Sequence, residues 1–145
     1  VTVIGESHYL ITELSGEVMA FTYNGDSLTW MQTIQADTLD ARGSADIHLS
    51  PDGRHLYASN RLKGDGLAIF QINGEDGTLT KIGYQPTGIH PRNFIITPNG
   101  KYVLVACRDT NEIQVFARDA STGLLTDTGQ SIKTTKPVCL KFIKM

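Results

Sequence analysis

The sequence predicts an all-β fold made of β-propeller blades, each a four-stranded antiparallel sheet. Three observations indicate this fold. A unit of 46 or 47 residues recurs along the 145-residue chain, each unit holds four short apolar runs separated by turns, and no stretch of about 11 residues has the 3.6-residue periodicity of a helix. An antiparallel sandwich is the alternative, but a sandwich does not require whole units to resemble one another.

The repeat is clearest in two segments that match residue by residue. Residues 47–61 read IHLSPDGRHLYASNR, and residues 94–108 read FIITPNGKYVLVACR. Further along, residues 77–80 correspond to residues 123–126. Each first strand ends in a Pro-Asp-Gly or Pro-Asn-Gly turn, in which proline presets φ and glycine accepts left-handed angles. The strands expected are 46–49, 56–60, 67–72 and 79–84 in one unit, and 93–96, 102–107, 113–117 and 125–130 in the next.

A weaker copy precedes these two units. Residues 9–13 resemble 56–60 and residues 18–21 resemble 67–70, but no opening strand is recognisable before them. Residues 137–143 read as a first strand with no blade after it. Because three blades cannot close a ring, we expect the C-terminal part of a larger propeller, which needs the remainder of that propeller as its partner. The expected blades are about 1–36, 45–85 and 92–131, and strand 137–143 is assigned to a closing blade.

The overall charge argues against two classes of partner. Thirteen Lys and Arg against 15 Asp and Glu give a net charge of -2, so no basic surface for nucleic acid or an anionic membrane is expected. No apolar run approaches the roughly 18 residues of a membrane helix, and the first residues lack the basic and apolar regions of a signal peptide. We expect a cytoplasmic protein in which Cys107 and Cys139, both in apolar strand-like runs, are reduced and buried.

The propeller topology indicates where a site would lie. A blade's first strand begins, and its second strand ends, at the same end of the central channel. Charged and imidazole side chains occupy these places: Glu13, Arg61 and Arg108 follow second strands, His90 and Arg92 precede a first strand, and Asp46 and His48 share one side of a first strand. We therefore expect a polar pocket at this channel mouth.

The residue types suggest chemistry on an anionic carbonyl substrate. Arginines bind anions bidentately and stabilise developing negative charge, and a Glu or His can activate water. We assign catalysis to Glu13, or to His48 held by Asp46. Substrate binding is assigned to Arg61, Arg92, His90 and Arg108.

Each assignment has a plainer alternative. Glu13 can be a solvated loop carboxylate, and His48 a hydrogen-bonded structural residue. His55 is expected in a surface turn, and Arg54 and Lys101 are expected to be solvated at the opposite end of the blades. No zinc or calcium ligand spacing and no nucleotide-binding motif is present, so neither a metal nor a cofactor is expected.

Several segments together resemble bacterial 6-phosphogluconolactonases of the propeller type, a lactonase family that also includes fungal muconate-lactonizing enzymes. They are ADIHLSPDGRHLY at 45–57, Asn60-Arg61, QPTGIHPRNF at 85–94 and NGKYVLVA at 99–106, and the match extends from about residue 9 to 142. The resemblance implies a seven-bladed propeller that hydrolyses 6-phosphogluconolactone in the pentose phosphate pathway without a metal. It also implies that Glu13 serves the active site, although Thr12 replaces the family's preceding Asn, and that Arg61 and Arg92 match channel-mouth arginines.

The function expected is therefore water addition to the carbonyl of a phosphorylated sugar lactone. The family's upstream His and Arg have no counterpart in this chain, so the 145 residues alone are expected to be inactive. A non-catalytic scaffold or ligand-binding propeller is one alternative, because a fold does not fix a function. A muconate-type cycloisomerase on the same scaffold is another.

Overall fold

The backbone forms twelve strands and no helix among residues 1–143, which are the residues that the computed structural model describes. They form three four-stranded antiparallel sheets, each taking its strands in chain order. The first sheet holds β1 (Thr2–Ile4), β2 (Ser7–Ile11), β3 (Glu17–Tyr23) and β4 (Leu28–Gln35). The second holds β5 (Ser44–Leu49), β6 (His55–Asn60), β7 (Gly66–Ile72) and β8 (Leu79–Pro86). The third holds β9 (Pro91–Ile96), β10 (Tyr102–Cys107), β11 (Glu112–Arg118) and β12 (Leu125–Lys133).

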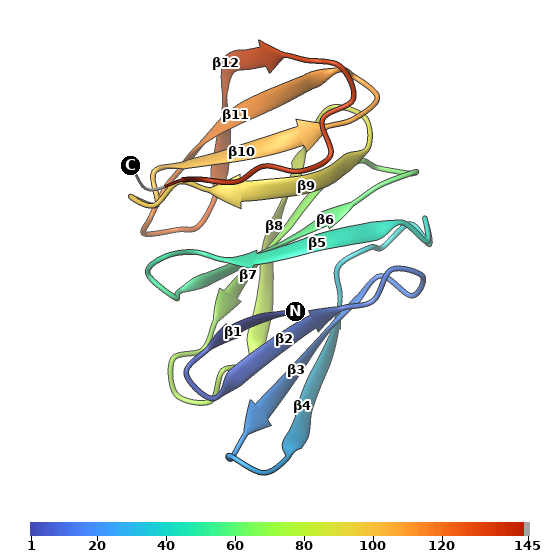
Figure 1. The fold of residues 1–145 in the computed structure, drawn as a ribbon. Helices are drawn as coiled ribbons and strands as arrows, with labels where there is room; N and C mark the ends of the chain where they lie inside the picture. The colour runs from blue at the N-terminus through green and yellow to red at the C-terminus, as the bar shows by residue number, and fades with distance from the viewer. Residues whose placement is uncertain (144–145) are drawn as a thin grey trace.

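The sheets follow one another in space as they do in the chain, from the blue N-terminal sheet to the orange and red C-terminal sheet (Figure 1). The all-β class and the four-stranded blades predicted from the repeat are confirmed. No helix in the described part of the chain is long and apolar enough to span a membrane.

The first sheet has an opening strand, so the prediction that this copy lacks one was wrong. β1 has three residues and pairs with β2 through Ile4 and Ser7. Gly5, at a φ of 55°, makes the tight turn between them and replaces the Pro-Asp-Gly turn of the other copies. A strand this short carries too few residues for a recognisable apolar alternation.

Strand pairing also shifts the sequence alignment of the first copy by one residue. Tyr9 pairs with Ala20, Tyr57 with Ile69 and Leu104 with Val115, and a β-bulge follows Ala20, Ile69 and Val115 in each third strand. Tyr9 is therefore equivalent to Tyr57 rather than to Leu56. The same register makes Glu13, Arg61 and Arg108 equivalent positions, whereas the sequence match had aligned Glu13 with Asn60.

The apolar core lies between the sheets in two layers. Strand β6 in the middle sheet is buried along its whole length, because it has a neighbouring sheet on both faces. Leu56 and Ala58 pack toward the first sheet with Tyr9 and Val18, whereas Tyr57 packs toward the third. Side chains that alternate along a strand thus fill two separate layers.

Each tyrosine at the shared register position also bonds to the next sheet. The Tyr9 hydroxyl donates to the Gly77 carbonyl at 2.8 Å, and the Tyr57 hydroxyl donates to the Gly123 carbonyl at 2.7 Å. Gly77 and Gly123 have φ of 75° and 76°, which favours glycine. A Cβ at Gly123 would also lie 2.3 Å from the His55 ring, so this turn admits no larger residue without a shift.

Residues 137–143 form no strand in this structure, and their assignment to a closing blade stays a prediction. The segment runs beside β9 (Figure 1), and its recorded contact is a hydrogen bond of 2.7 Å from the Leu140 amide to Asn93 Oδ1. A strand forms only when its backbone groups pair with a neighbouring strand, and no such pairing is recorded for this segment within residues 1–143. Cys139 lies here and is exposed, so its predicted burial was wrong, whereas Cys107 in β10 is buried. Both cysteines are free, as expected.

Candidate functional site

The ends of second strands and the beginnings of first strands meet at one edge of the stacked sheets. Ser44, which begins β5, pairs with Asn60 at the end of β6, and Pro91 at the start of β9 pairs with Cys107 at the end of β10. An open pocket of about 400 Å³ lies at this edge. Its lining residues come from all three sheets and the C-terminal segment: Ile11, Glu13, Ser44, Ala45, Asp46, Arg61, Arg92, Asn93 and Val138.

Arg61 is buried, with 5% of its surface exposed, and most of its N–H groups are bound to the protein. Its Nε donates to the Gly43 carbonyl at 2.8 Å, and one terminal nitrogen lies 3.0 Å from His90 Nε2. The other terminal nitrogen donates to Glu13 Oε1 at 2.7 Å and to the Ser44 carbonyl at 3.4 Å. A guanidinium has five N–H groups, so Arg61 keeps little capacity for a ligand.

Glu13 stands at the opening of the pocket. Its side chain is 64% exposed, and the contact with Arg61 fixes its Oε1 atom. Among residues 1–143, Oε2 has no recorded hydrogen-bond donor and faces solvent. The geometry therefore presents one immobilised carboxylate with one free oxygen, which is suited to accept a proton from water.

Arg92 has the opposite character to Arg61. It lines the same pocket and is exposed, and no hydrogen bond or ion pair of its side chain is recorded within residues 1–143. Its guanidinium is thus available to an anion entering the pocket, for which its planar array of donors is well suited.

Asp46 is a hydrogen-bond centre in the pocket wall. Its Oδ2 atom accepts from Asn93 Nδ2 at 2.6 Å, from the Phe94 amide at 3.2 Å and from His48 Nε2 at 3.0 Å. Burial alone would raise the pKa of Asp46, but the hydrogen bond and charge of His48 and the backbone amides outweigh it, and the pKa is lowered. His48 packs edge-on against Phe94 and does not line the pocket, although its bond to Asp46 is the one expected.

Two residues assigned to substrate binding lie away from the pocket. His90 is buried behind Arg61, with 6% of its surface exposed. Arg108 makes a bidentate pair with Asp109, at 2.8 and 3.0 Å, and does not line the pocket. Glu13, Arg61, Arg92 and Asp46 are therefore the predicted residues that the fold brings together, while His48, His90 and Arg108 flank them.

Sequence reasoning missed several pocket residues. Ser44 lies two residues before Asp46 in β5, and Asn93 lies directly after Arg92 in β9. Asn93 follows Arg92 directly, so the strand-start rule applied to Arg92 would have found it. Val138 gave no signal, because its place depends on the hydrogen bond between Leu140 and Asn93.

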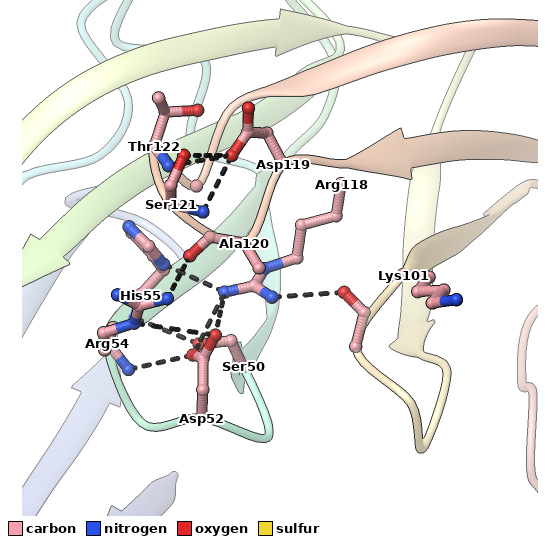
Figure 2. A network of polar contacts seen from close by, with 12 residues as sticks. Ser50, Asp52, Arg54, His55, Lys101, Arg118, Asp119, Ala120, Ser121 and Thr122 are labelled. Atoms are coloured by element: carbon pink, nitrogen blue, oxygen red, sulfur yellow. Dashed lines mark hydrogen bonds and ion pairs between the residues drawn. The ribbon is translucent and has the colours of Figure 1, made fainter.

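A second polar cluster, at the opposite ends of the sheets, was also missed (Figure 2). Arg118 at the end of β11 is 7% exposed, and it donates to both carboxylate oxygens of Asp52 at 3.0 and 2.8 Å and to His55 Nδ1 at 3.0 Å. Its remaining nitrogens donate to the Tyr57 hydroxyl at 2.9 Å and the Gly100 carbonyl at 3.1 Å.

His55 belongs to this cluster, so its expected place in a surface turn was wrong: it is 3% exposed. Its ring lies against the Arg118 side chain and the Gly123 turn of the next sheet, which no local pattern around His55 indicates. Arg54 and Lys101 are exposed at this end, as predicted. Burial and the charge of Arg118 lower the pKa of His55, which keeps its Nδ1 free to accept a hydrogen bond.

Within residues 1–143, no group of three or more His, Cys, Asp or Glu side chains is arranged to hold a metal ion. The pocket lining itself offers two carboxylates, Glu13 and Asp46, and two guanidiniums, Arg61 and Arg92.

Comparison with known proteins identifies the family of the chain. A family model described as a lactonase, seven-bladed β-propeller, matches residues 4–142. A 6-phosphogluconolactonase of Formosa agariphila is 46% identical over 125 residues, which are 83% of this chain and 35% of that protein. A crystal structure described as a candidate 6-phosphogluconolactonase, from Bacteroides uniformis, is 67% identical with a TM-score of 0.94, over 96% of this chain and 40% of that one.

A periplasmic gluconolactonase of Pseudomonas aeruginosa is 34% identical with a TM-score of 0.90, over 97% of this chain and 40% of that one. The chain thus spans about two fifths of the length of the relatives it matches. Its three sheets, their register and the matched residues 4–142 establish its membership: the chain belongs to the lactonase family of seven-bladed β-propellers.

Proposed function

We propose that the protein to which these residues belong hydrolyses the lactone of a phosphorylated sugar acid, converting 6-phosphogluconolactone into 6-phosphogluconate in the pentose phosphate pathway. One observation supports this most directly. A pocket of about 400 Å³ holds a carboxylate fixed by a buried arginine, Glu13 on Arg61, together with a second arginine, Arg92, whose donors are available. The names of the relatives from Formosa agariphila and Bacteroides uniformis point to the same substrate.

The proposed reaction uses the two arginines differently. Arg92 binds the phosphate of the substrate, and Arg61 holds Glu13 in place instead of binding substrate itself. Glu13 Oε2 takes a proton from water while the water oxygen bonds to the lactone carbonyl carbon. The ring C–O bond then breaks, and its oxygen takes up the proton, which leaves the open-chain acid.

His48 is the second candidate for the base. Its Nε2 atom is bound to Asp46, so its Nδ1 atom would have to accept the proton. Glu13 is the preferred candidate for the base because it lines the same pocket as Arg92, whereas His48 does not line this pocket.

The experiment compares variants of the full-length protein on two substrates, 6-phosphogluconolactone and unphosphorylated gluconolactone. Glu13→Gln removes the proton acceptor but keeps the size of the side chain, and we expect kcat to fall by about 100-fold or more on both substrates. Arg92→Ala should raise KM for the phosphorylated lactone by roughly 10-fold or more, since a charge-assisted hydrogen bond contributes about 1.5–3 kcal/mol. It should change KM little for the unphosphorylated lactone.

Arg54→Ala, an exposed arginine at the opposite end of the sheets, is the matched control and should leave both constants unchanged. If the Glu13→Gln variant turns over substrate normally, His48 becomes the candidate for the catalytic base, and His48→Asn tests it. If the unaltered protein hydrolyses neither lactone above the uncatalysed rate, the scaffold hypothesis replaces this one. A smaller KM for gluconolactone than for the phosphorylated substrate would shift the proposal to the substrate named for the Pseudomonas aeruginosa relative.

The cytoplasm is the proposed compartment, because 6-phosphogluconolactone would be a cytoplasmic metabolite. The name of the Pseudomonas aeruginosa relative shows that this family also has a periplasmic member. Cell fractionation of the native organism, followed by immunodetection, decides between the two.

A further inference from the structure

We propose that His90 is a positioning residue: a neutral imidazole whose Nε2 atom holds the Arg61 guanidinium, and through it the Glu13 carboxylate, in the pocket. This inference rests on the proposed function and adds a component to it. His90 does not itself line the pocket, and its side-chain contact with a lining residue is the one to Arg61, so it acts through Arg61.

The contact itself fixes the protonation state of His90. Its Nε2 atom lies 3.0 Å from a terminal nitrogen of Arg61. An arginine nitrogen can only donate, so Nε2 must carry no proton, and the single proton of the neutral ring sits on Nδ1. Nδ1 faces the carboxylate of Asp109, with its Oδ2 atom 3.7 Å away. This carboxylate favours the same tautomer.

The backbone holds His90 in an unusual conformation. Its φ is 63°, in the left-handed region, and of the non-glycine residues with positive φ among residues 1–143 it is the buried one. Two hydrogen bonds hold it: its amide donates to Asp65 Oδ1 at 2.7 Å, and its carbonyl accepts from the Arg108 amide at 3.1 Å. Non-glycine residues adopt such angles at an energetic cost, and they keep them where the surrounding contacts hold the backbone in place.

Three guanidiniums and one carboxylate act on the ring: Arg61 from the turn after β6, Arg108 and Asp109 after β10, and Arg92 on the same segment. The Asp65 carboxylate, before β7, binds the backbone amide of His90. Burial, followed by the positive charges of Arg108 and Arg61, lowers the pKa of His90, although Asp109 opposes the shift. The ring is therefore neutral at pH 7. When it gains a proton in acid, it loses its acceptor and places a positive charge against Arg61.

Protonation of His90 should consequently remove the acceptor of one terminal nitrogen of Arg61 and push the guanidinium away. The Glu13 carboxylate, which is bound to the other terminal nitrogen, would shift with it. The effect would fall on kcat, because a small displacement of a catalytic group costs rate, whereas Arg92 would continue to bind the substrate anion.

The test uses two variants of the full-length protein and a pH profile. His90→Leu removes the acceptor, and kcat at pH 7.5 should fall about tenfold or more with KM nearly unchanged. His90→Gln offers an amide oxygen that accepts but does not titrate. It should restore part of the kcat lost in the Leu variant. In the unaltered protein, protonation of His90 should lower kcat in acid with a pKa below that of an ordinary histidine, and the Gln variant should lack this step.

A spectroscopic measurement tests the same contact without relying on activity. In ¹⁵N-histidine-labelled protein, the His90 signals, assigned by their absence in His90→Gln, should show a neutral ring protonated at Nδ1 at pH 7.5. A proton on Nε2 at that pH would overturn the proposal. So would Leu and Gln variants whose kcat and pH profile match the unaltered protein.

The two proposals can fail separately. If the unaltered protein shows no lactone hydrolysis while the tautomer is as expected, the proposed function fails and the contact between His90 and Arg61 stands. If hydrolysis is normal but the His90→Leu variant is indistinguishable, the positioning role fails and the function stands. Should His90→Leu not fold, the comparison of His90→Gln with the unaltered protein in the acid range decides.

Discussion

Arg61 and Arg118 are both buried guanidiniums, and they lie at opposite ends of the sheets. Arg61 connects the second sheet to Glu13 in the first, beside the pocket, whereas Arg118 connects the third sheet to Asp52 in the second (Figure 2). Burial alone would raise the pKa of Asp52, but hydrogen bonds from Ser50 and Arg118 hold it well below its usual range. Each arginine joins two blades, and only the Arg61 pair leaves a carboxylate oxygen free for chemistry.

Arg118→Leu in the full-length protein should lower the free energy of unfolding by about 3 kcal/mol, because it leaves Asp52 and the Tyr57 hydroxyl without their buried partner. Arg54 lies 3.8 Å from the same carboxylate on the exposed side, so Arg54→Ala is the matched control and should change stability by less than about 0.5 kcal/mol. Denaturant titration measures both. Equal losses of unfolding free energy in the two variants would show that the burial of Arg118 contributes nothing to stability. Lactone kinetics should be unchanged in both variants, since the cluster is remote from the pocket.

The strands carry a repeated contact that joins each sheet to the next. Tyr9 in β2 and Tyr57 in β6 occupy the same register position, and each donates to the carbonyl of a glycine in the turn before the last strand of the following sheet. The third copy has Leu104 at this position. Its side chain borders an open groove on the outer face of the third sheet instead of a fourth sheet.

The two tyrosines provide an internal comparison. Tyr9→Phe removes one hydrogen bond and should cost about 1 kcal/mol of unfolding free energy. Tyr57→Phe should cost more, about 2 kcal/mol or above, because the Tyr57 hydroxyl also accepts from Arg118 Nε, and that donor would be left buried without a partner. Chemical denaturation of the full-length variants measures the difference. Identical losses would mean that the Arg118 contact contributes nothing through Tyr57.

The outer faces of the first and third sheets lack the neighbour that covers both faces of the middle sheet. Val1, Val3, Leu28 and Trp30 are exposed on the first sheet, and Ile132 is exposed on the third. Apolar side chains and open strand edges of this kind favour association. The family's seven-bladed description accounts for them as surfaces that further blades would cover.

Expressed alone, residues 1–145 should therefore self-associate or melt without cooperativity. Sedimentation velocity over a range of concentrations, with thermal unfolding followed by circular dichroism, checks this. The full-length protein is the control. Its blades should not mediate association between molecules, and it should unfold in a single cooperative transition. A monomeric 145-residue chain that melts cooperatively would contradict the expectation.

Much of this arrangement could be predicted from the chain alone. The 46- to 47-residue repeat and its turns gave the four-stranded sheets, because alternation and turn chemistry are local properties. The same repeat placed Glu13, Arg61 and Arg92 at one end of the sheets, and the pocket there includes all three. The short strand β1 escaped notice because three residues carry too little pattern.

Side-chain pairing between sheets was decided only by the tertiary structure. That Arg61 bonds to Glu13 and His90, that Arg118 buries His55, and that Val138 reaches the pocket are contacts between residues far apart in the chain. A repeat fixes where each side chain starts on its own strand. Which partner it reaches depends on the distance and twist between neighbouring sheets, and in a low-dielectric interface each buried donor must find its acceptor across that gap.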